Sequence, residues 1–441
     1  MTKAGLRGCF GIALIIAAIA WAFCAPAGAQ VPRVPDGPAV QVQFQIIHAF
    51  GGPGDGIGPG GGMVMDSKGN LYGVTGAGGA QGGGGTVYEL SPGANGPWTE
   101  TILHSFPIKA PSDGFEPIGM VIDGAGNLYG TTLFGGDGQY CFKWDYNGCG
   151  TVFELSPGAN GEWTESILWN FCSLSDCADG TDPLVAPTLG PGGSLYGVAG
   201  TAFQLTPGSG GWTFTLLYTF CGIGPDCPTG SQPSSSLTLD AGGNLYGETS
   251  TGGDCSDNLG CGVVYVLHQQ TNGQWKEVVL HDFGSMEDGD GPTGGLTFHD
   301  GGLYGVTEGG GDGCLPGCGT AFELTRGSGN NINEQIFWNF GGDGGAQGVS
   351  PGGGVVFNNQ GDMFGVTGLG GEGGYGIVYG MKPEQNGKWA YAVLHTFDGS
   401  DGVEPETVTI DSKGDLFGTT GGGGAIGGGV AFELSPVKQG R

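Results

Sequence analysis

A short phrase recurs seven times along the chain and constrains the fold more than any other sequence feature. Each copy has a glycine, a small or polar residue, an aliphatic, an aromatic and a second glycine. The copies span residues 69–73, 126–130, 193–197, 243–247, 301–305, 361–365 and 414–418, with their aromatics 50 to 67 residues apart. A repeat of this size is one supersecondary unit that cannot bury its own apolar face, so neighbouring units must share a core.

Each unit reads as four short strands. In the second unit the segments 117–123, 127–132, 151–155 and 163–171 are apolar or alternating, and turns rich in Gly, Pro, Asn and Ser separate them. Four short strands repeated in series are typical of a β-propeller blade. The sequence therefore predicts an all-β protein, a seven-bladed β-propeller of four-stranded blades.

The two ends of the repeat region predict how the ring closes. The last unit stops after its third strand, at residues 431–434. Residues 44–50 match the fourth strands at 102–106 and 393–397. We therefore expect the N-terminal strand to complete the last blade.

The first 29 residues have the pattern of a secretory signal peptide. Lys3 and Arg7 precede an almost wholly apolar run, and 27–29 read Ala-Gly-Ala. An uncleaved anchor is the alternative. We assign residues 30–40 to a short linker, 41–435 to the propeller and 436–441 to a C-terminal tail. No second apolar run is long enough to span a bilayer, so we expect a secreted, periplasmic or extracellular protein without a transmembrane segment after cleavage.

Ten cysteines follow the signal peptide and fall into five close pairs. The pairs are Cys141/Cys149, Cys172/Cys177, Cys221/Cys227, Cys255/Cys261 and Cys314/Cys318. An even count in an exported chain indicates disulfides. Each bridge would close a short loop and stabilise the fold by at most roughly 2–3 kcal/mol. Two pairs in neighbouring loops forming one metal site are the alternative.

The formal net charge of −29 limits the partners. Such a charge repels nucleic acid and anionic lipid and favours cations or neutral ligands. We expect a monomer that binds an envelope or extracellular protein or a carbohydrate.

Several motifs recur in the same order from unit to unit. Gly-Asn-Leu-Tyr-Gly-x-Thr, a Gly-Gly loop, Gly-Thr-Val-Phe-Glu-Leu and Ile-Leu-His-x-Phe resemble the GloVer tandem repeat of exported bacterial proteins, most closely at residues 126–132 and 150–155. The resemblance covers about residues 41–435. It implies an exported repeat protein and assigns no activity. The blade pattern is more distantly similar to NHL-type propellers, which is an analogy of fold alone.

A turn before each inner strand carries the most regular polar feature. All seven turns contain Gly-x-x-Pro, and five begin with an aspartate: Asp55, Asp113, Asp179, Asp288 and Asp401. Further carboxylates in these turns are Glu116, Asp182, Asp290 and Glu404. If the turns lie at the mouth of the axial channel, the five aspartates are candidate calcium ligands, and the carboxylates of all but the first turn are candidate ligand-binding groups. Aspartate before glycine also forms turns, so a purely structural role is the alternative.

A long loop of the second unit, residues 133–150, carries a second candidate ligand site. Trp144 and Tyr146 lie between the first two paired cysteines. An aromatic loop closed by a disulfide beside acidic turns could bind a ligand such as a carbohydrate. A loop that packs its own aromatics against the ring is the alternative.

The histidines favour packing over proton transfer. His48, His104, His281 and His395 share one register of the fourth strand, where other units carry Trp169, Tyr218 and Trp338. No nucleophile elbow or His-Glu-x-x-His is present, so we assign no catalytic residue. Binding or scaffolding is the leading function; we expect no cofactor, and calcium is the one candidate. The alternative is a propeller enzyme, a lyase or hydrolase acting on glycans or lactones.

Overall fold

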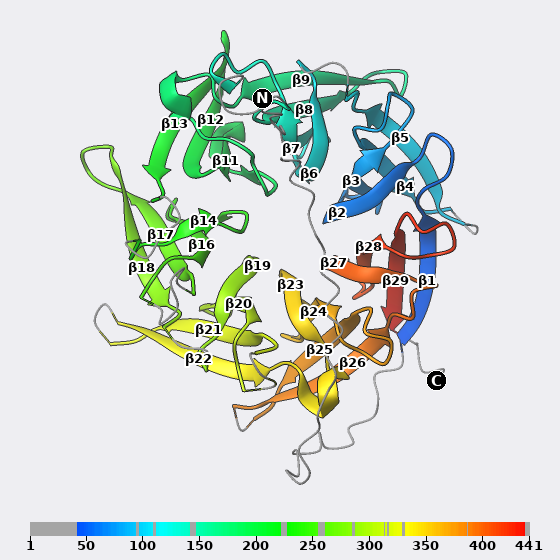
Figure 1. Cartoon of the computed structure of the whole chain (residues 1–441), viewed down its shortest axis with the longest axis vertical. Helices are drawn as coiled ribbons and strands as arrows, with labels where there is room; N and C mark the ends of the chain where they lie inside the picture. The colour runs from blue at the N-terminus through cyan, green and yellow to red at the C-terminus, as the bar shows by residue number, and fades with distance from the viewer. Residues whose placement is uncertain are drawn as a thin grey trace, which may run out of the picture. The chain divides into compact units, whose positions relative to one another are not determined.

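Seven antiparallel sheets stand as blades around a ring in the computed structural model (Figure 1). The structure describes residues 42–93, 97–108, 112–141, 147–221, 227–254, 261–284, 287–312, 314, 317–328, 331–385 and 387–436. The predicted signal peptide and linker, most of the predicted tail, and Trp144, Tyr146 and Cys255 lie outside these residues. The all-β, seven-bladed prediction is confirmed.

In blades 1, 2, 3, 5 and 6 the strands follow one another in chain order from the inner to the outer edge. In blade 4 two short strands, β14 and β15, both pair with β16 at the inner edge. Blade 1 contains β2 (Gly56–Met65), β3 (Leu71–Gly78), β4 (Thr86–Ser91) and β5 (Thr99–Ser105); blade 2 contains β6 (Gly114–Ile122), β7 (Leu128–Gly135), β8 (Thr151–Pro157) and β9 (Trp163–Asn170). Blade 3 contains β10 (Thr188–Leu189), β11 (Leu195–Val198), β12 (Thr201–Gly208) and β13 (Gly211–Thr219). Blade 4 contains β14 (Ser231–Pro233), β15 (Thr238–Leu239), β16 (Leu245–Thr251), β17 (Val263–Gln269) and β18 (Trp275–Asp282). Blade 5 contains β19 (Asp290–His299), β20 (Gly302–Gly309), β21 (Thr320–Arg326) and β22 (Ile332–Asn339). Blade 6 contains β23 (Val349–Phe357), β24 (Met363–Leu369), β25 (Ile377–Pro383) and β26 (Trp389–Thr396).

The seventh blade is built from both ends of the propeller. Its strands β27 (Val403–Ile410), β28 (Leu416–Gly422) and β29 (Val430–Pro436) are completed by β1 (Val42–Ala49), which pairs antiparallel with β29. Ala49 pairs with Val430 and Phe44 pairs with Leu434. The predicted closure of the ring is confirmed.

The second glycine of the repeated phrase makes room for a buried ring on the next strand. Gly247 on β16 lies opposite Tyr265 on β17, whose side chain is fully buried. A methyl group on Gly247 would lie closer to the tyrosine hydroxyl than real Cβ contacts allow. The same arrangement recurs in the other blades, with these third-strand rings: Tyr88, Phe153, Phe203, Phe322, Tyr379 and Phe432. The glycine is therefore required by packing between strands, not by a turn.

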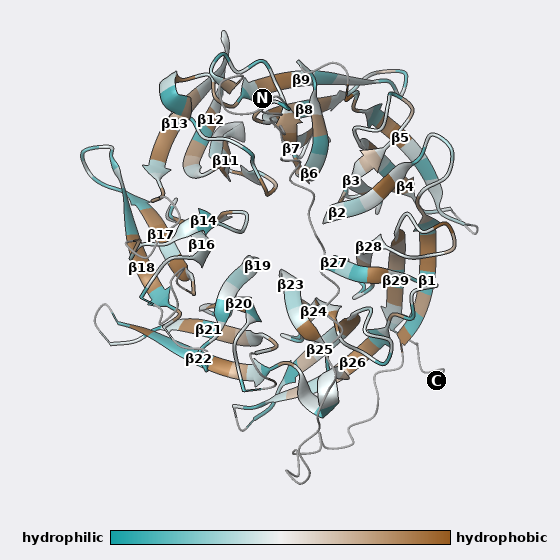
Figure 2. Cartoon of the chain, in the orientation of Figure 1, coloured by the Kyte–Doolittle hydropathy of each residue, from teal (hydrophilic) through white to brown (hydrophobic). Residues whose placement is uncertain are grey.

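A phenylalanine after each fourth strand joins one blade to the next. Phe106, which follows β5, packs edge-on against Phe153 of blade 2, with ring centroids 5.3 Å apart. Equivalent pairs recur at the other six interfaces, and the apolar clusters span neighbouring blades. Figure 2 shows apolar colour concentrated on the strands and polar colour in many connections. The core therefore continues around the ring.

Short disulfides hold several connections. Four of the five predicted pairs are bridged in the described part of the chain: Cys141–Cys149, Cys172–Cys177, Cys221–Cys227 and Cys314–Cys318.

The fifth predicted pair, Cys255 and Cys261, differs from the other four because only one of its members is described. Cys261 is buried, with 1% of its surface exposed, and its sulfur is disulfide-bonded. Its predicted partner Cys255 lies outside the described residues. The pairing of Cys261 with Cys255 therefore stays a prediction.

Helical structure among the described residues is limited to short 3-10 turns. None of these turns is long or apolar enough to cross a membrane.

Candidate functional site

In most units, the residue before the turn proline connects neighbouring blades through its backbone N–H. Its backbone adopts a left-handed φ in all seven units, for example 58° at Glu116 and 56° at Glu404. The Glu116 N–H donates to the Gly84 carbonyl at 2.7 Å, and the Glu404 N–H donates to the Tyr375 carbonyl at 3.1 Å. Both acceptors belong to the preceding blade's connection between its second and third strands. The recurring Gly-x-x-Pro thus has a structural role.

The five turn aspartates are distributed around the ring, one at each of five interfaces. Asp401 Oδ2 lies 2.8 Å from His395 Nε2, and Asp179 Oδ2 accepts a hydrogen bond from the Trp169 indole at 3.0 Å. Asp55, Asp113 and Asp288 each lie near a histidine of the preceding outer strand. Among the described residues, no group of three potential metal ligands contains two of these aspartates. Any function of the aspartates in metal binding would therefore use separate sites.

The other predicted ligand-binding residues also occupy different blades. Glu116 and Asp182 share the register of Glu404 on blades 2 and 3, and Asp290 begins β19. Burial raises the pKa of Glu116. Of the ten predicted ligand-binding residues, eight are described, and one of these, Glu404, lines the pocket that follows.

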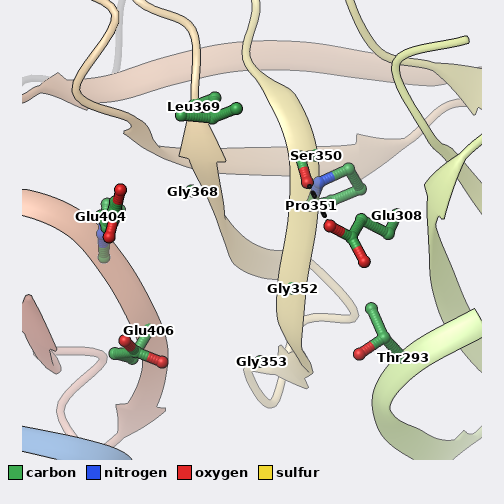
Figure 3. A pocket seen from close by; sticks show the side chains of 11 residues that line it. Thr293, Glu308, Ser350, Pro351, Gly352, Gly353, Gly368, Leu369, Glu404 and Glu406 are labelled. Atoms are coloured by element: carbon green, nitrogen blue, oxygen red, sulfur yellow. Dashed lines mark hydrogen bonds between the residues drawn. The ribbon is translucent and has the colours of Figure 1, made fainter. Parts of the chain in front are cut away.

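An acidic pocket of about 400 Å³ lies between blades 5, 6 and 7 (Figure 3). Glu308 lies on β20, Glu404 and Glu406 lie on β27, and Ser350 lies on β23. None of the described residues that line the pocket is basic. Proline rings and the half-exposed Leu369 form an apolar part of its wall. The pocket thus presents three carboxyl groups to one volume.

One of these carboxyl groups, Glu406, has a pKa shifted toward neutrality although part of its surface is exposed. Burial raises the pKa of Glu406 to about 7, and the charge of Glu404 adds to the shift. On the opposite wall, the Ser350 hydroxyl donates to Glu308 Oε1 at 3.3 Å. The carboxylates can accept hydrogen bonds or neutralise a cation, and Glu406 can exchange a proton near pH 7.

Glu406 and Glu308 of this pocket were not predicted from the sequence, because the prediction considered only positions that recur from unit to unit. Glu406 is unique in its register, where the other units carry Gly60, Ile118, Leu184, Ser234, Thr293 and Gly352. Glu308 likewise occupies a register in which no other unit has an acid. A search for departures from the repeat would have found both.

Comparisons with solved structures return other proteins of low identity. A gluconolactonase from Xanthomonas campestris is 12% identical, with a TM-score of 0.39 and 89% of each chain covered. The periplasmic gluconolactonase PpgL of Pseudomonas aeruginosa is 14% identical, with a TM-score of 0.45 and coverage of 80% of this chain and 86% of that chain. PorZ of Porphyromonas gingivalis is 13% identical, with a TM-score of 0.49, and the match covers 88% of this chain and 47% of that one. Likeness at this level assigns no activity.

The sequence itself identifies the family. No curated protein matches the chain. The family model of the Gloeobacter/Verrucomicrobia repeat matches residues 37–199 and 197–387, well over half of the chain, and thereby confirms the expected resemblance. This protein therefore belongs to the Gloeobacter/Verrucomicrobia repeat family.

Proposed function

We propose that the protein is an exported binding or scaffolding propeller whose acidic pocket receives a cationic group of its ligand. One observation carries the proposal: Glu308, Glu404 and Glu406 surround a single cavity without a basic side chain among its described lining residues. The overall charge of −29 also attracts cationic partners. The ligand is then an envelope or extracellular protein that presents lysine or arginine, or an amino-bearing carbohydrate.

Calcium is the competing occupant of the pocket. Carboxylate and hydroxyl oxygens are its preferred ligands, and Glu308, Glu404, Glu406 and Ser350 supply them. Added Ca²⁺ is therefore expected to displace an amine-bearing ligand.

The proposed location outside the cytoplasm is supported by the bridges. Four disulfides are present among the described residues, and such bonds persist in oxidising compartments. We propose a monomer there, released from its signal peptide.

Isothermal titration with chitosan hexamer and its fully N-acetylated counterpart tests the binding role. The two sugars share a backbone and differ in their amino groups, so the acidic pocket should favour chitosan, with an affinity that falls as salt rises. The double variant Glu404→Gln/Glu406→Gln should lose this preference. Glu162→Gln, an exposed carboxylate in the β8–β9 turn, is the matched control. Equal binding of both sugars, or a preference that survives the double variant, would contradict the proposal.

A second candidate is a lyase or hydrolase acting on glycans or lactones. It is favoured by Glu406, because a general acid or base works best with a pKa near the operating pH. Turnover of a sugar lactone or a uronate oligosaccharide that falls about 100-fold or more in Glu406→Gln, with ligand affinity retained, would support the enzyme. If the unmodified protein turns over none of these substrates, the enzyme candidate is rejected and the pocket is assigned to ligand binding.

A further inference from the structure

Three blade interfaces, away from the acidic pocket, contain a His–Asp–Glu cluster of one design. The histidine comes from an outer strand, the aspartate from the turn that follows it, and the glutamate from the outer strand of the next blade. The clusters are His48/Asp55/Glu100 between blades 7 and 1, His104/Asp113/Glu165 between blades 1 and 2, and His281/Asp288/Glu334 between blades 4 and 5.

The ligand atoms of these clusters are spaced as metal ligands would be. His48 Nε2 lies 3.2 Å from Asp55 Oδ2 and 3.4 Å from Glu100 Oε1. In the other two clusters the histidine nitrogen lies between 3.3 and 3.9 Å from the carboxylate oxygens. A tetrahedral zinc ion with bonds of roughly 2.0–2.1 Å places neighbouring ligand atoms about 3.3 Å apart. The ligand atoms of each cluster all lie within 4.8 Å of one another, so small side-chain shifts would bring them to bonding distance from one ion.

Several polar atoms of the cluster residues are fully buried without a hydrogen-bond partner. In the cluster between blades 1 and 2 these atoms are His104 Nε2, Asp113 Oδ1 and Glu165 Oε1. The other two clusters contribute Glu100 Oε1, His281 Nε2 and Glu334 Oε1. Buried polar groups are normally satisfied, so each orphaned atom requires an explanation. The side chains keep 10% to 23% of their surface exposed, which leaves an approach for an ion and a water ligand.

The four remaining interfaces show how the same positions are filled without such a cluster. Between blades 3 and 4, the Tyr218 hydroxyl donates to Glu277 Oε2 at 2.7 Å. Aromatic rings stack at the other three interfaces: Trp169 on Phe214, Trp338 on Tyr391 and His395 on Phe44. Glu277 Oε1 and Trp338 Nε1 at these interfaces also lack a hydrogen-bond partner, so what distinguishes the three clusters is that each brings three potential metal ligands together. Histidine and glutamate face each other across an interface in the three clusters, and there the aspartate adds a third ligand.

We propose that each of the three clusters binds a zinc ion through its histidine, aspartate and glutamate, so that the metal joins the outer strands of neighbouring blades. Imidazole nitrogen with carboxylate oxygen suits zinc, whereas calcium requires six to eight oxygen ligands. The aspartate and the glutamate of each cluster carry like charges when both are ionised, and a divalent cation between them would neutralise this repulsion.

Zinc titration of chelator-treated, full-length mature protein tests the proposal, with bound metal counted by mass spectrometry after gel filtration. The unmodified protein should retain three equivalents, and zinc should raise its melting temperature by mass action. Glu165→Gln, which keeps side-chain size, should reduce the uptake to two equivalents. Glu277→Gln, in the same register but paired with Tyr218, should leave three. No tight uptake by the unmodified protein, or three equivalents in Glu165→Gln, would overturn the assignment.

A variant that adds a metal site distinguishes loss of a metal ligand from loss of the fold, because a misfolded protein cannot gain a site. At the interface of blades 6 and 7, His395 and Asp401 already lie 2.8 Å apart, and Phe44 occupies the register that carries glutamate in the clusters. Phe44→Glu supplies the missing ligand and should raise the uptake to four equivalents, a gain that misfolding cannot imitate. A folded Phe44→Glu protein that retains three equivalents would refute the ligand set.

Discussion

Replacing Glu248 by glutamine is expected to change how the stability of the propeller depends on pH. Glu248 lies on β16 with no exposed surface. The other units carry valine or threonine in this register: Val74, Thr131, Val198, Val306, Val366 and Thr419. The Gly295 N–H donates to its Oε2 at 3.0 Å, and its Oε1 has no hydrogen-bond partner. Burial raises the pKa of this carboxyl to about 8, and the Gly295 N–H offsets only part of the shift.

The magnitude follows from proton linkage. The folded protein holds the Glu248 proton up to about pH 8, whereas the unfolded chain releases it near 4.5. The contribution of this group to stability is therefore fully present below pH 4.5 and is lost as the pH rises to about 8, at roughly 1.4 kcal/mol per pH unit. By pH 7 the loss is about 3 kcal/mol. Glutamine does not titrate, so the unfolding free energy of the variant minus that of the parent should rise by about 3 kcal/mol between pH 4.5 and pH 7.

Urea unfolding followed by tryptophan fluorescence measures this difference. Both proteins are unfolded with their disulfides intact at several pH values from 4.5 to 8, and subtraction removes the titration of all other groups. Glu162→Gln, an exposed carboxylate, should show no such trend. A Glu248→Gln difference that is independent of pH would refute the reasoning, because the carboxyl would then ionise equally in both states.

Three further results are expected. Gly247→Ala should destabilise the fold by about 1–3 kcal/mol in urea unfolding, because its methyl group meets the Tyr265 ring. Gly422→Ala is the control, since a methyl group there has open space and should not destabilise the fold. Equal effects of the two substitutions would contradict the packing argument. Phe106→Ala should cost about 3–5 kcal/mol by the same assay, since a fully buried ring between two blades leaves a cavity, and a loss below 1 kcal/mol would count against that interface. Thiol titration of the unfolded, unreduced mature protein should find no reactive cysteine, Cys261 included, and several reactive thiols would contradict the assigned bridges.

The fold could be predicted because each blade repeats the same local pattern. The match between residues 44–50 and the other fourth strands predicted the closure that β1 and β29 form. The sequence did not explain why the second glycine of the phrase is needed, because the ring that it accommodates, such as Tyr265 for Gly247, lies on the next strand. Pairing between strands has to be known before such a contact can be inferred.

The candidate sites were harder to predict because they join residues of different blades. The sequence showed His104 and Asp113 in their separate registers, but Glu165 reaches them from the next blade, and its position was not singled out. In the sequence, three units with a histidine on the outer strand are each followed by a unit with a glutamate on its own outer strand. That co-occurrence could have indicated the clusters. The acidic pocket depends on Glu308 and Glu406, which break the repeat rather than follow it.

The origin of blade 7 has a consequence for how the protein is made. Its outermost strand, β1, is among the first parts synthesised, yet its partner β29 follows roughly 380 residues later. At about 5–20 residues per second, the ribosome needs on the order of 20–80 s to supply that partner. Throughout this interval β1 presents an unpaired strand edge, which is a template for association between chains. Nascent propellers are therefore most exposed to strand exchange with one another before the last three strands emerge, and a factor that shields residues 42–49 would act in that interval.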